Sequence, residues 1–458
     1  MKIRKIWIKG FKQFKDFELD LTNPHTGEAL DKVCFIGQNG TGKSTLLSFI
    51  SEFLLSLSIP KECPAASAIE FNFHNLNCIY CNAYSNNNRR LSYDKHIFNA
   101  NIKNVDNWFD YVCSSGPEQI QDLINKYQDS SLVVDGQNIN QLFKFNNNSS
   151  DLLLYSPSEA PQNSYLNING VPQTNVNQAL GLFKEFPFYH LVSSESVQQF
   201  WTLLIYSIKK RQEEQEKYEL ADENINKSKK ELITEFESVY PQILTKLGEI
   251  WNKILSKAGL YFDAEGASKP FQLSDNLHAY IKTIATNEKI EYNQLSTGIR
   301  NFIFRIGHIY SLYFNREIKK GIVLIDEPEN SLFPDFLYDL IETYQEVMVD
   351  KNGENNSQLF VATHSPIIAA QFEPYERIML HWDEPGSVKA HKGTAPAGDD
   401  PNDILKKDFG IAHLMGKKGE EMFKEYLEMK KKLRHTTDEK EKDKLIGIIT
   451  KLGADYNF

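Results

Sequence analysis

The sequence predicts an α/β fold: a head domain built on a parallel sheet, with a mixed β lobe, a helical insertion and a helical C-terminal tail. Three stretches favour this fold. The run VCFI breaks into a glycine-rich loop and continues as an amphipathic segment, the run GIVLID ends in acids, and the run QLFVATH ends in a histidine. Because parallel strands place their carboxyl ends at one edge of a sheet, these polar ends are expected to share an edge.

Composition limits the class of protein. With 458 residues, of which 41% are hydrophobic, the chain is long enough for two or three domains, or for one domain with large insertions. No apolar run reaches the roughly 18 residues of a membrane-spanning helix, so we expect a cytoplasmic protein that does not bind a membrane. The net charge of −10 argues against a globally basic surface for nucleic acid, although a local basic groove stays open.

The glycine-rich loop carries the strongest chemical signal. Gly37, Gly42, Lys43 and Ser44 fit the spacing G-x-x-x-x-G-K-[ST], in which backbone N–H groups surround a polyphosphate at the start of a helix. Lys43 would reach the outer phosphates, and the Ser44 hydroxyl would bind Mg²⁺. A plain glycine turn between strand and helix is the alternative. The predicted phosphate-binding residues are Gly37, Gln38, Asn39, Gly40, Thr41, Gly42, Lys43, Ser44 and Thr45.

Residues 1–21 alternate apolar and polar side chains, with a turn signal near Gly10. This pattern predicts an antiparallel hairpin just before the phosphate-loop strand. Lys12 or Phe14 could contact a nucleotide from this hairpin, but an ordinary hairpin role is favoured for both.

Strand-like runs separated by asparagine-rich loops follow from residue 61 to residue 195 and predict an inserted β-rich lobe. Within it, the run from Leu152 to Glu159 has the pattern of a buried strand that leads into a loop. That loop could approach the nucleotide, with Gln162 as a candidate sensor, but the position of a sensor glutamine stays open.

Residues 196–256 predict a helical insertion, beginning with a charge-rich span typical of a solvated helix surface. An apolar stripe follows at steps of three and four residues, interrupted by Pro241. The favoured interpretation is that this stripe packs on the head domain, and a short intermolecular helical contact is the alternative. The stripe comprises Leu232, Phe236, Val239, Ile243, Leu247, Ile250 and Ile254.

A second anion site is indicated by the run QLSTGIRNFIFR, residues 294–305. Ser296, Thr297 and Gly298 stand at the predicted start of a helix, where a hydroxyl and free amides attract an anion. An ordinary capped helix is the alternative interpretation.

Two strand ends supply the expected catalytic groups. After four aliphatic residues, Asp326 would hold Mg²⁺ through its water shell, and Glu327 would orient or deprotonate the attacking water. The alternative is that these acids only cap the following helix. His364, at the end of the next predicted strand, is expected to sense the γ-phosphate.

The segment from residue 393 to residue 458 predicts a helical tail, long enough for a helical hairpin and suited to docking. Asp400 and Pro401 match an N-cap and a first helical residue. A metal site formed with Asp399 and Asp403 is the weaker alternative.

The ordered set GQNGTGKST, LSTG, LIDEPE and THSP resembles the ABC-type P-loop ATPase head shared by RecF, SMC-type repair proteins and the OLD family. The resemblance covers residues 1–60 and 257–392. The run DEPENSLFP followed by THSP is most similar to OLD-like ATPases. The compact size with a helical tail resembles phage-defence ATPases such as PtuA of Septu systems and AriA of PARIS systems.

This resemblance implies a dimer in which two heads enclose two ATP molecules. Gly37–Thr45, Asp326, Glu327 and His364 of one chain would hold each ATP, and Ser296 and Gly298 of the other chain would cap it. Thr297 departs from the pattern, since many members carry glycine there. Too few residues follow the last predicted strand for a Toprim nuclease domain, so nuclease chemistry is expected in a partner.

The leading hypothesis is therefore an ATP hydrolase that controls an effector nuclease in anti-phage defence. A RecF-like or SMC-like repair head that binds DNA is the alternative. A transporter subunit is disfavoured by the long separation of phosphate loop and signature, and a structural nucleotide with little turnover stays open. The predicted organisation is head 1–60, β-rich lobe 61–195, helical insertion 196–256, head 257–392 and tail 393–458.

Overall fold

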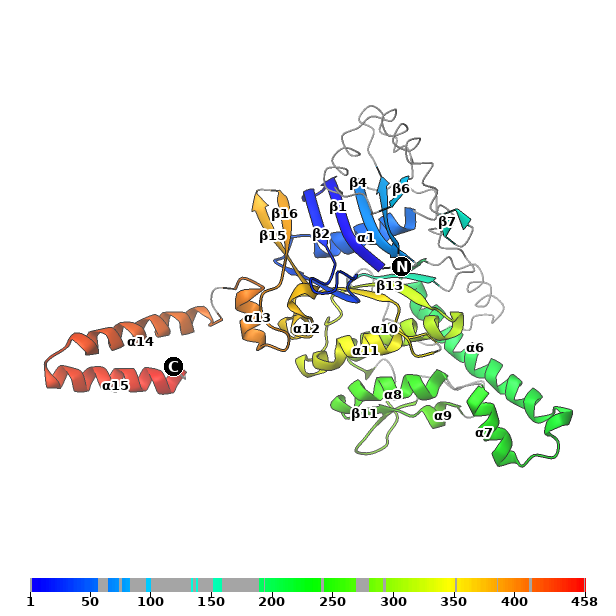
Figure 1. Cartoon of the computed structure of the whole chain (residues 1–458). Coiled ribbons are helices and arrows are strands. Elements are labelled where there is room, and N and C mark those ends of the chain that lie inside the picture. The colour runs from blue at the N-terminus through cyan, green and yellow to red at the C-terminus, as the bar shows by residue number, and fades with distance from the viewer. Residues whose placement is uncertain are drawn as a thin grey trace.

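The computed structural model (Figure 1) places a central sheet between two covering layers, with a helical hairpin extending to one side. It describes residues 2–56, 65–73, 76–82, 96–99, 133–134, 137–138, 151–158, 189–192, 194–239, 243–268, 280–290, 294–350, 352–384, 386–411, 414–456 and 458.

The central sheet has seven strands in the order β10-β9-β13-β14-β3-β15-β16. Every neighbouring pair is parallel except β15 and β16, which are antiparallel. The α/β fold with a parallel sheet is therefore confirmed. The strands are β3 (Lys32–Gly37), β9 (Asp151–Ser156), β10 (Tyr189–Leu191), β13 (Lys320–Asp326), β14 (Gln358–Ala362), β15 (Arg377–Glu384) and β16 (Ser387–Lys392).

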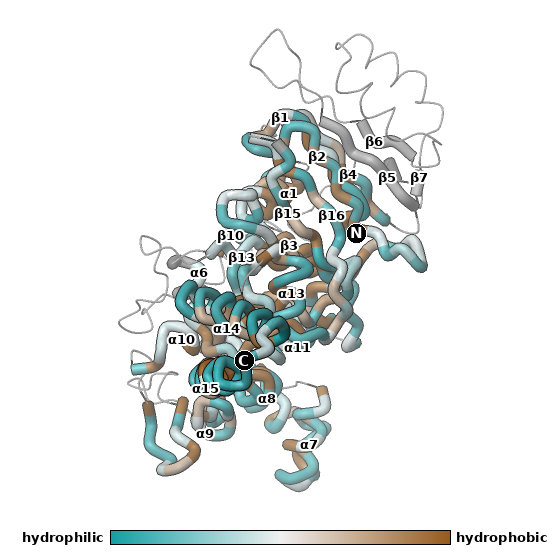
Figure 2. The backbone as a smooth tube through the Cα atoms, turned by 90° about the vertical axis from the view of Figure 1, so that its left-hand side faces the viewer, coloured by the Kyte–Doolittle hydropathy of each residue, from teal (hydrophilic) through white to brown (hydrophobic). Residues whose placement is uncertain are grey.

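Alternation along the strands buries both faces of this sheet. In β13, Val323 and Ile325 pack into one hydrophobic core with α6 (Ser194–Glu219), α8 (Ile243–Leu255), α10 (Thr297–Arg316) and α11 (Leu340–Val347). Ile322 and Leu324 point to the other face, where a second core includes α1 (Lys43–Ser56). Figure 2 shows hydrophobic residues around β3 and α1. Continuous aliphatic runs are what a strand covered on both faces requires.

A second, antiparallel sheet covers the α1 face, in the order β2-β1-β4-β5-β6. The predicted N-terminal hairpin is confirmed, but its turn lies at Lys12 and Gln13, since Phe11 pairs with Phe14. Lys12 takes the left-handed φ of 50° that a tight two-residue turn needs. Gly10, where the sequence indicated the turn, instead lies within β1. The strands are β1 (Lys2–Phe11), β2 (Phe14–Asp20), β4 (Ala66–Phe73), β5 (Leu76–Asn82) and β6 (His96–Asn99).

The described strands of residues 61–195 do not share one sheet. Strands β4 to β6 extend the sheet of the N-terminal hairpin, β9 and β10 lie in the central sheet, and β7 (Val133–Val134) pairs with β8 (Gln137–Asn138). Strand pattern alone does not identify a strand's partners, so the sequence could not tell which sheet each strand of this range joins. Its boundaries stay a prediction, and Glu159 and Gln162 lie outside the described residues.

The helical insertion packs on the head domain, as the favoured interpretation predicts. Helix α8 contributes buried apolar residues to the core around α10, and the Trp251 indole N–H donates to the carbonyl of Ile303 at 3.1 Å. In α7 (Lys229–Val239), Leu232 and Phe236 are buried, whereas Val239 is 62% exposed. The buried part of the stripe in α7 therefore ends before Val239.

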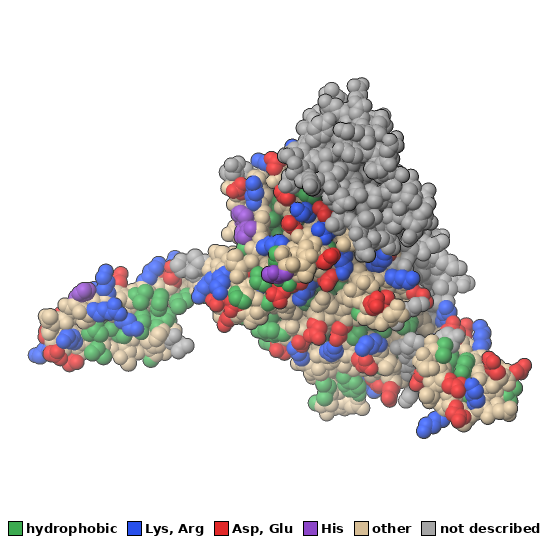
Figure 3. All heavy atoms as spheres, viewed as in Figure 1, with side chains coloured by type: hydrophobic (Ala, Val, Ile, Leu, Met, Phe, Trp, Pro, Cys, Tyr) green, Lys and Arg blue, Asp and Glu red, His purple; other side chains and the backbone are tan. Residues whose placement is uncertain are grey.

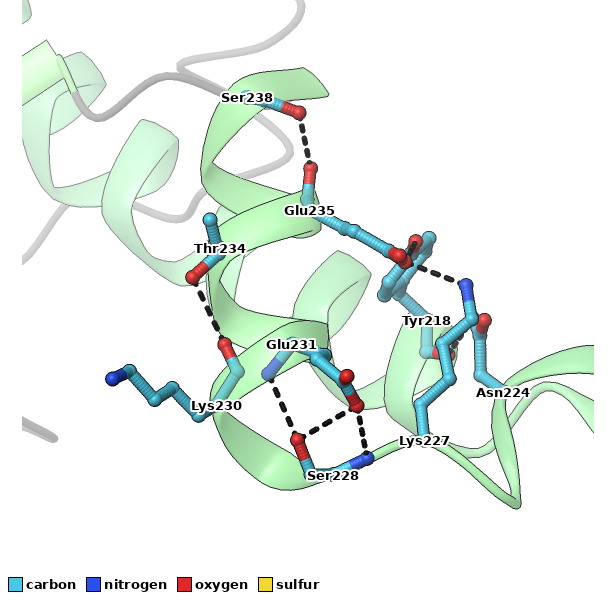
Figure 4. Close-up of polar contacts among 9 residues, drawn as sticks. All are labelled: Tyr218, Asn224, Lys227, Ser228, Lys230, Glu231, Thr234, Glu235 and Ser238. Carbon is cyan, nitrogen blue, oxygen red and sulfur yellow. Dashed lines mark hydrogen bonds and ion pairs between the residues drawn. The ribbon is translucent and has the colours of Figure 1, made fainter.

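Polar contacts fix the corner between α6 and α7 (Figure 4). Glu231 accepts from the backbone N–H of Ser228 at 2.9 Å, while the Ser228 hydroxyl accepts from the Glu231 N–H. This reciprocal pair is a capping box, which satisfies two N–H groups at the start of α7. Tyr218 and Lys227 both donate to Glu235, which ties α7 back to the end of α6.

A short hairpin and the helical tail complete the described structure. Strands β11 (Leu260–Phe262) and β12 (Ile281–Thr283) pair next to α9 (Ala264–Ser268). Asp400 caps α13 (Pro401–Lys407) by accepting from the Asn402 N–H at 2.7 Å. Helices α14 (Lys417–His435) and α15 (Glu439–Tyr456) form the predicted hairpin, which extends away from the sheets (Figure 1). Within the described residues, no helix is long and apolar enough to cross a membrane.

Candidate functional site

The phosphate loop joins β3 to α1 and needs its glycines for close packing. A Cβ atom on Gly37 would overlap the carbonyl of Leu380, and one on Gly42 would overlap the side chains of Gln13 and Phe14. Gly42 also has a φ of +97°, a backbone conformation that residues with a Cβ atom rarely adopt. The loop can therefore follow this tight path only with glycine at both positions.

Lys43 folds back over the loop. Its Nζ donates to the carbonyls of Gly37 at 2.8 Å and Gln38 at 3.3 Å, and the residue is only 6% exposed. The Thr41 hydroxyl is also buried and donates to the Gln38 carbonyl at 2.8 Å. In the rest of the loop, Gln38, Asn39, Gly40 and Ser44 are exposed, and Gly42 and Thr45 are half-buried.

The two predicted acids stand at the end of β13. Asp326 is the last strand residue and is 2% exposed. Glu327 follows with a left-handed φ of 46°, and its N–H donates to the carbonyl of Ala362 at 2.8 Å. A left-handed backbone at a residue other than glycine costs about 1–2 kcal/mol, and such strain collects at functional sites.

Burial and neighbouring charges shift the pKa values of Lys43 and Glu327. Burial lowers the pKa of Lys43, and the negative charges of Asp326, Glu327 and Glu329 oppose that effect. Burial raises the pKa of Glu327, and the charges of Asp326 and Glu329 raise it further. A carboxylate with a raised pKa beside a cation is suited to accept a proton from water.

His364 joins the same group from the neighbouring strand. It follows the end of β14, is exposed, and its backbone N–H donates to Glu329 Oε1 at 2.8 Å. Partial burial and the charge of Lys43 lower the pKa of His364, and the charge of Asp326 opposes them. The imidazole is therefore neutral near pH 7. Since β13, β14 and β3 are adjacent, the predicted acids, His364 and the phosphate loop meet at one edge.

The predicted signature residues lie at the start of α10. Ser296 is exposed and caps the helix, because its hydroxyl accepts from the Ile299 N–H at 3.3 Å. Gly298 is buried, and a Cβ atom there would overlap the carbonyl of Ser331 in the loop after β13. The structure thus brings Gly298 to the acid-bearing loop of its own chain. Anion binding by Ser296 and Gly298 stays a prediction.

Sequence reasoning missed three residues at this edge. Gln13 donates to the Gly40 carbonyl at 3.4 Å from the β1–β2 turn. Arg305 of α10 is 3% exposed and donates to the carbonyls of Asp326 and Pro157, each at 3.0 Å. Glu329 contacts the end of β14. Of these three, only Arg305 had a signal in the sequence: it stands at a position of the helical repeat where an apolar residue is expected.

The residues present fit a magnesium ion. Mg²⁺ prefers oxygen ligands and is usually held by one or two side chains together with substrate phosphates. Ser44 and Asp326 supply such oxygens, and the buried Ser156 Oγ at the end of the adjacent strand β9 has no hydrogen-bond partner among the described side chains. Among the described residues, no cluster of three or more metal-ligating side chains is present.

The acids near α13 have a structural explanation. Asp400 caps the helix, and Lys407 pairs with Asp399 at 3.1 Å and with Asp403 at 3.6 Å. Capping, the favoured interpretation, accounts for their arrangement.

A phosphate loop, two acids at a parallel strand end and a histidine on the next strand define a P-loop ATPase. The chain belongs to the AAA ATPase domain family, whose model matches residues 1–369. It therefore binds and hydrolyses ATP. No curated protein matches the chain.

Proposed function

We propose that this ATPase works as a head-to-head homodimer that closes on two ATP molecules and controls a partner effector, a nuclease, in anti-phage defence. The observation that supports catalysis best is the convergence of Lys43, Asp326, Glu327 and His364 at the ends of three adjacent strands.

Each of these groups has a defined task. Gly37–Thr45 surround the triphosphate with backbone N–H groups, and Lys43 turns from the loop carbonyls to the outer phosphates. Glu327 accepts a proton from the attacking water, and neutral His364 donates a hydrogen bond to the outer phosphate. Ser44 and Asp326 hold Mg²⁺, which, when bound, neutralises the charge on the phosphate oxygens.

The dimer is supported by the exposed surface beside the site. Ser296 is exposed at the start of α10, where its hydroxyl can reach an anion on a second copy. In the loop that contacts Gly298, Phe333 is 68% exposed, and Tyr338 nearby is 54% exposed. Exposed aromatic residues are typical of the energetic centre of a protein interface.

The effector surface is proposed on the hairpin of α14 and α15. Figure 3 shows hydrophobic side chains gathered over these helices. Leu427 is 49% exposed and Ile446 is 48% exposed, although both lie on helices rich in charge. A two-helix hairpin that extends from the body presents such residues to another chain.

Sedimentation of the Glu327→Gln variant tests the dimer. We expect this variant to bind ATP without turnover and to shift from monomer to dimer when ATP and Mg²⁺ are added. Adding Ser296→Arg should abolish the shift, since a bulky charge would face the partner's ATP. A monomer at saturating ATP would overturn the dimer proposal.

Affinity purification from a cell in which the neighbouring genes are expressed tests the effector. The native chain should retain a nuclease, and Leu427→Glu with Ile446→Glu should lose it. Leu220, which follows the last residue of α6 and is 73% exposed, offers the matched control Leu220→Glu, which should retain the partner. Equal recovery with all variants would remove the hairpin from the proposal.

A further inference from the structure

Glu329 joins the loop after β13 to the end of β14. Its Oε1 accepts two hydrogen bonds, from the Thr363 hydroxyl at 2.6 Å and from the backbone N–H of His364 at 2.8 Å. One donor belongs to His364 itself, and the other belongs to the residue before it. One carboxylate oxygen therefore fixes the backbone from which the His364 side chain projects.

This contact is the centre of a longer chain of hydrogen bonds. Thr363 is fully buried, and its hydroxyl oxygen also accepts from the Ser365 N–H at 2.9 Å. On the other side, the Glu327 N–H donates to the Ala362 carbonyl at 2.8 Å. The loop after β13 therefore contacts three successive residues, Ala362, Thr363 and His364, and Glu329 makes the contacts to the last two.

The second oxygen of Glu329 differs from the first. Oε2 is buried and has no hydrogen-bond partner among the described residues. A buried polar atom without a partner is costly, so a residue with only a packing role would seldom carry a polar end group here. The charge of Glu329 does act on Lys43, but its effect is smaller than those of Asp326 and Glu327.

We infer that Glu329 is a positioning residue: it holds the backbone of Thr363 and His364 so that the imidazole lies at the outer phosphate of bound ATP. This inference rests on the proposed catalytic role of His364. Glu329 itself touches neither substrate nor water in this assignment.

Steady-state ATP hydrolysis with four variants tests this role: Glu329→Ala, Glu329→Gln, His364→Ala and the double variant Glu329→Ala with His364→Ala. Misplacing a reacting group by about 1 Å can cost about 100-fold in rate. We expect Glu329→Ala to lower kcat by about 10-fold to 100-fold and to leave KM for ATP within about twofold.

The other variants separate positioning from charge. Glutamine keeps an oxygen that can accept from Thr363 and His364, so Glu329→Gln should retain kcat within about threefold of the native value. If Glu329 acts only through His364, the double variant should be no slower than His364→Ala alone. Glu231→Ala is the matched control, because it removes a carboxylate that accepts a backbone N–H far from the site.

Two results would overturn the inference. Equal losses in Glu329→Gln and Glu329→Ala would show that charge, not the accepting oxygen, matters. A double variant slower than His364→Ala by the full Glu329→Ala factor would show that the two residues act separately. If Glu329→Ala does not fold, Thr363→Val removes the hydroxyl that donates to Glu329 and accepts from Ser365, at nearly constant volume, and should lower kcat with KM unchanged. A native chain without ATP hydrolysis would instead overturn the proposed function.

Discussion

Left-handed backbone at two residues marks the loop that follows β13. Glu327 has a φ of 46° and Ser331 a φ of 64°, and neither is glycine. Each costs about 1–2 kcal/mol, which the surrounding hydrogen bonds must offset. The carbonyl of Ser331 lies against Gly298, so the loop's shape depends on the absence of a side chain at the start of α10.

Gly298→Ala should disturb this loop directly. The added Cβ would overlap backbone atoms of Ser331 and Leu332, which cannot rotate away as a side chain can. We expect a loss of about 1–3 kcal/mol in the free energy of unfolding, measured with urea, and slower ATP hydrolysis. At Gly447 of α15, an added Cβ would have no heavy atom within 4 Å, so Gly447→Ala should not destabilise the protein. Equal stability of both variants would contradict this packing.

His308 predicts how stability depends on pH. It is buried and stacked on Phe304, with ring centroids 5.4 Å apart, and burial lowers its pKa to about 4. As pH falls below about 6.5, the unfolded chain gains a proton here while the folded protein does not. The neutral His308 therefore contributes fully to the free energy of unfolding above pH 6.5, and this contribution is lost as pH falls toward 4. The loss amounts to about 2 kcal/mol between pH 7 and pH 5.

Urea unfolding at pH 7 and pH 5 measures this effect. The His308→Phe variant keeps an aromatic ring in the stack and should lose less stability on acidification than the native protein. The exposed His435 provides the control His435→Phe, which should retain the native pH dependence. An unchanged pH dependence in His308→Phe would contradict a neutral buried imidazole.

At the scale of elements, a buried ion pair ties α13 to the sheet. Arg377 at the start of β15 and Asp408 at the end of α13 are both fully buried, with Nε and Oδ2 3.0 Å apart. They form an ion pair rather than an aligned hydrogen bond. Asp408 Oδ1 also accepts from the backbone N–H groups of Thr394 and Ala395. One carboxylate therefore holds helix, strand and connecting loop together.

Asp408→Ala should leave the Arg377 guanidinium buried without its counter-charge. Removing one partner of a buried pair costs about 3–5 kcal/mol, which should appear as a lower urea midpoint. Asp403→Ala removes a half-buried partner of Lys407 on the same helix and should change stability by less than about 1 kcal/mol. Similar losses in both variants would contradict the account of this anchor.

The sequence predicted individual elements better than contacts between them. The phosphate loop, the strand ending at Asp326 and the cap at Ser296 were predictable, because each depends on residues close together in the chain. Gln13, Arg305 and Glu329 were not, since their partners lie far away in sequence and only the sheet order brings them together. For the same reason, the pairing of β4 with β1 was missed.

At the scale of the whole molecule, the strand order explains why one edge can hold all the chemistry. Strand β14 lies between β13 and β3, so the histidine-bearing loop stands between the acids and the phosphate loop. Both faces of the sheet are covered, which leaves its carboxyl edge as the place where polar groups gather. The proposed dimer would bring a second chain's Ser296 to this edge.

The central claim is that Glu327 is the base for ATP hydrolysis at this edge, and turnover by the Glu327→Gln variant tests it most directly. Phosphate release and ATP binding should be measured on the same native and variant preparations. Our account predicts native affinity for ATP with turnover lowered by about 100-fold or more, as expected for loss of a general base. Turnover equal to that of the native protein would contradict it.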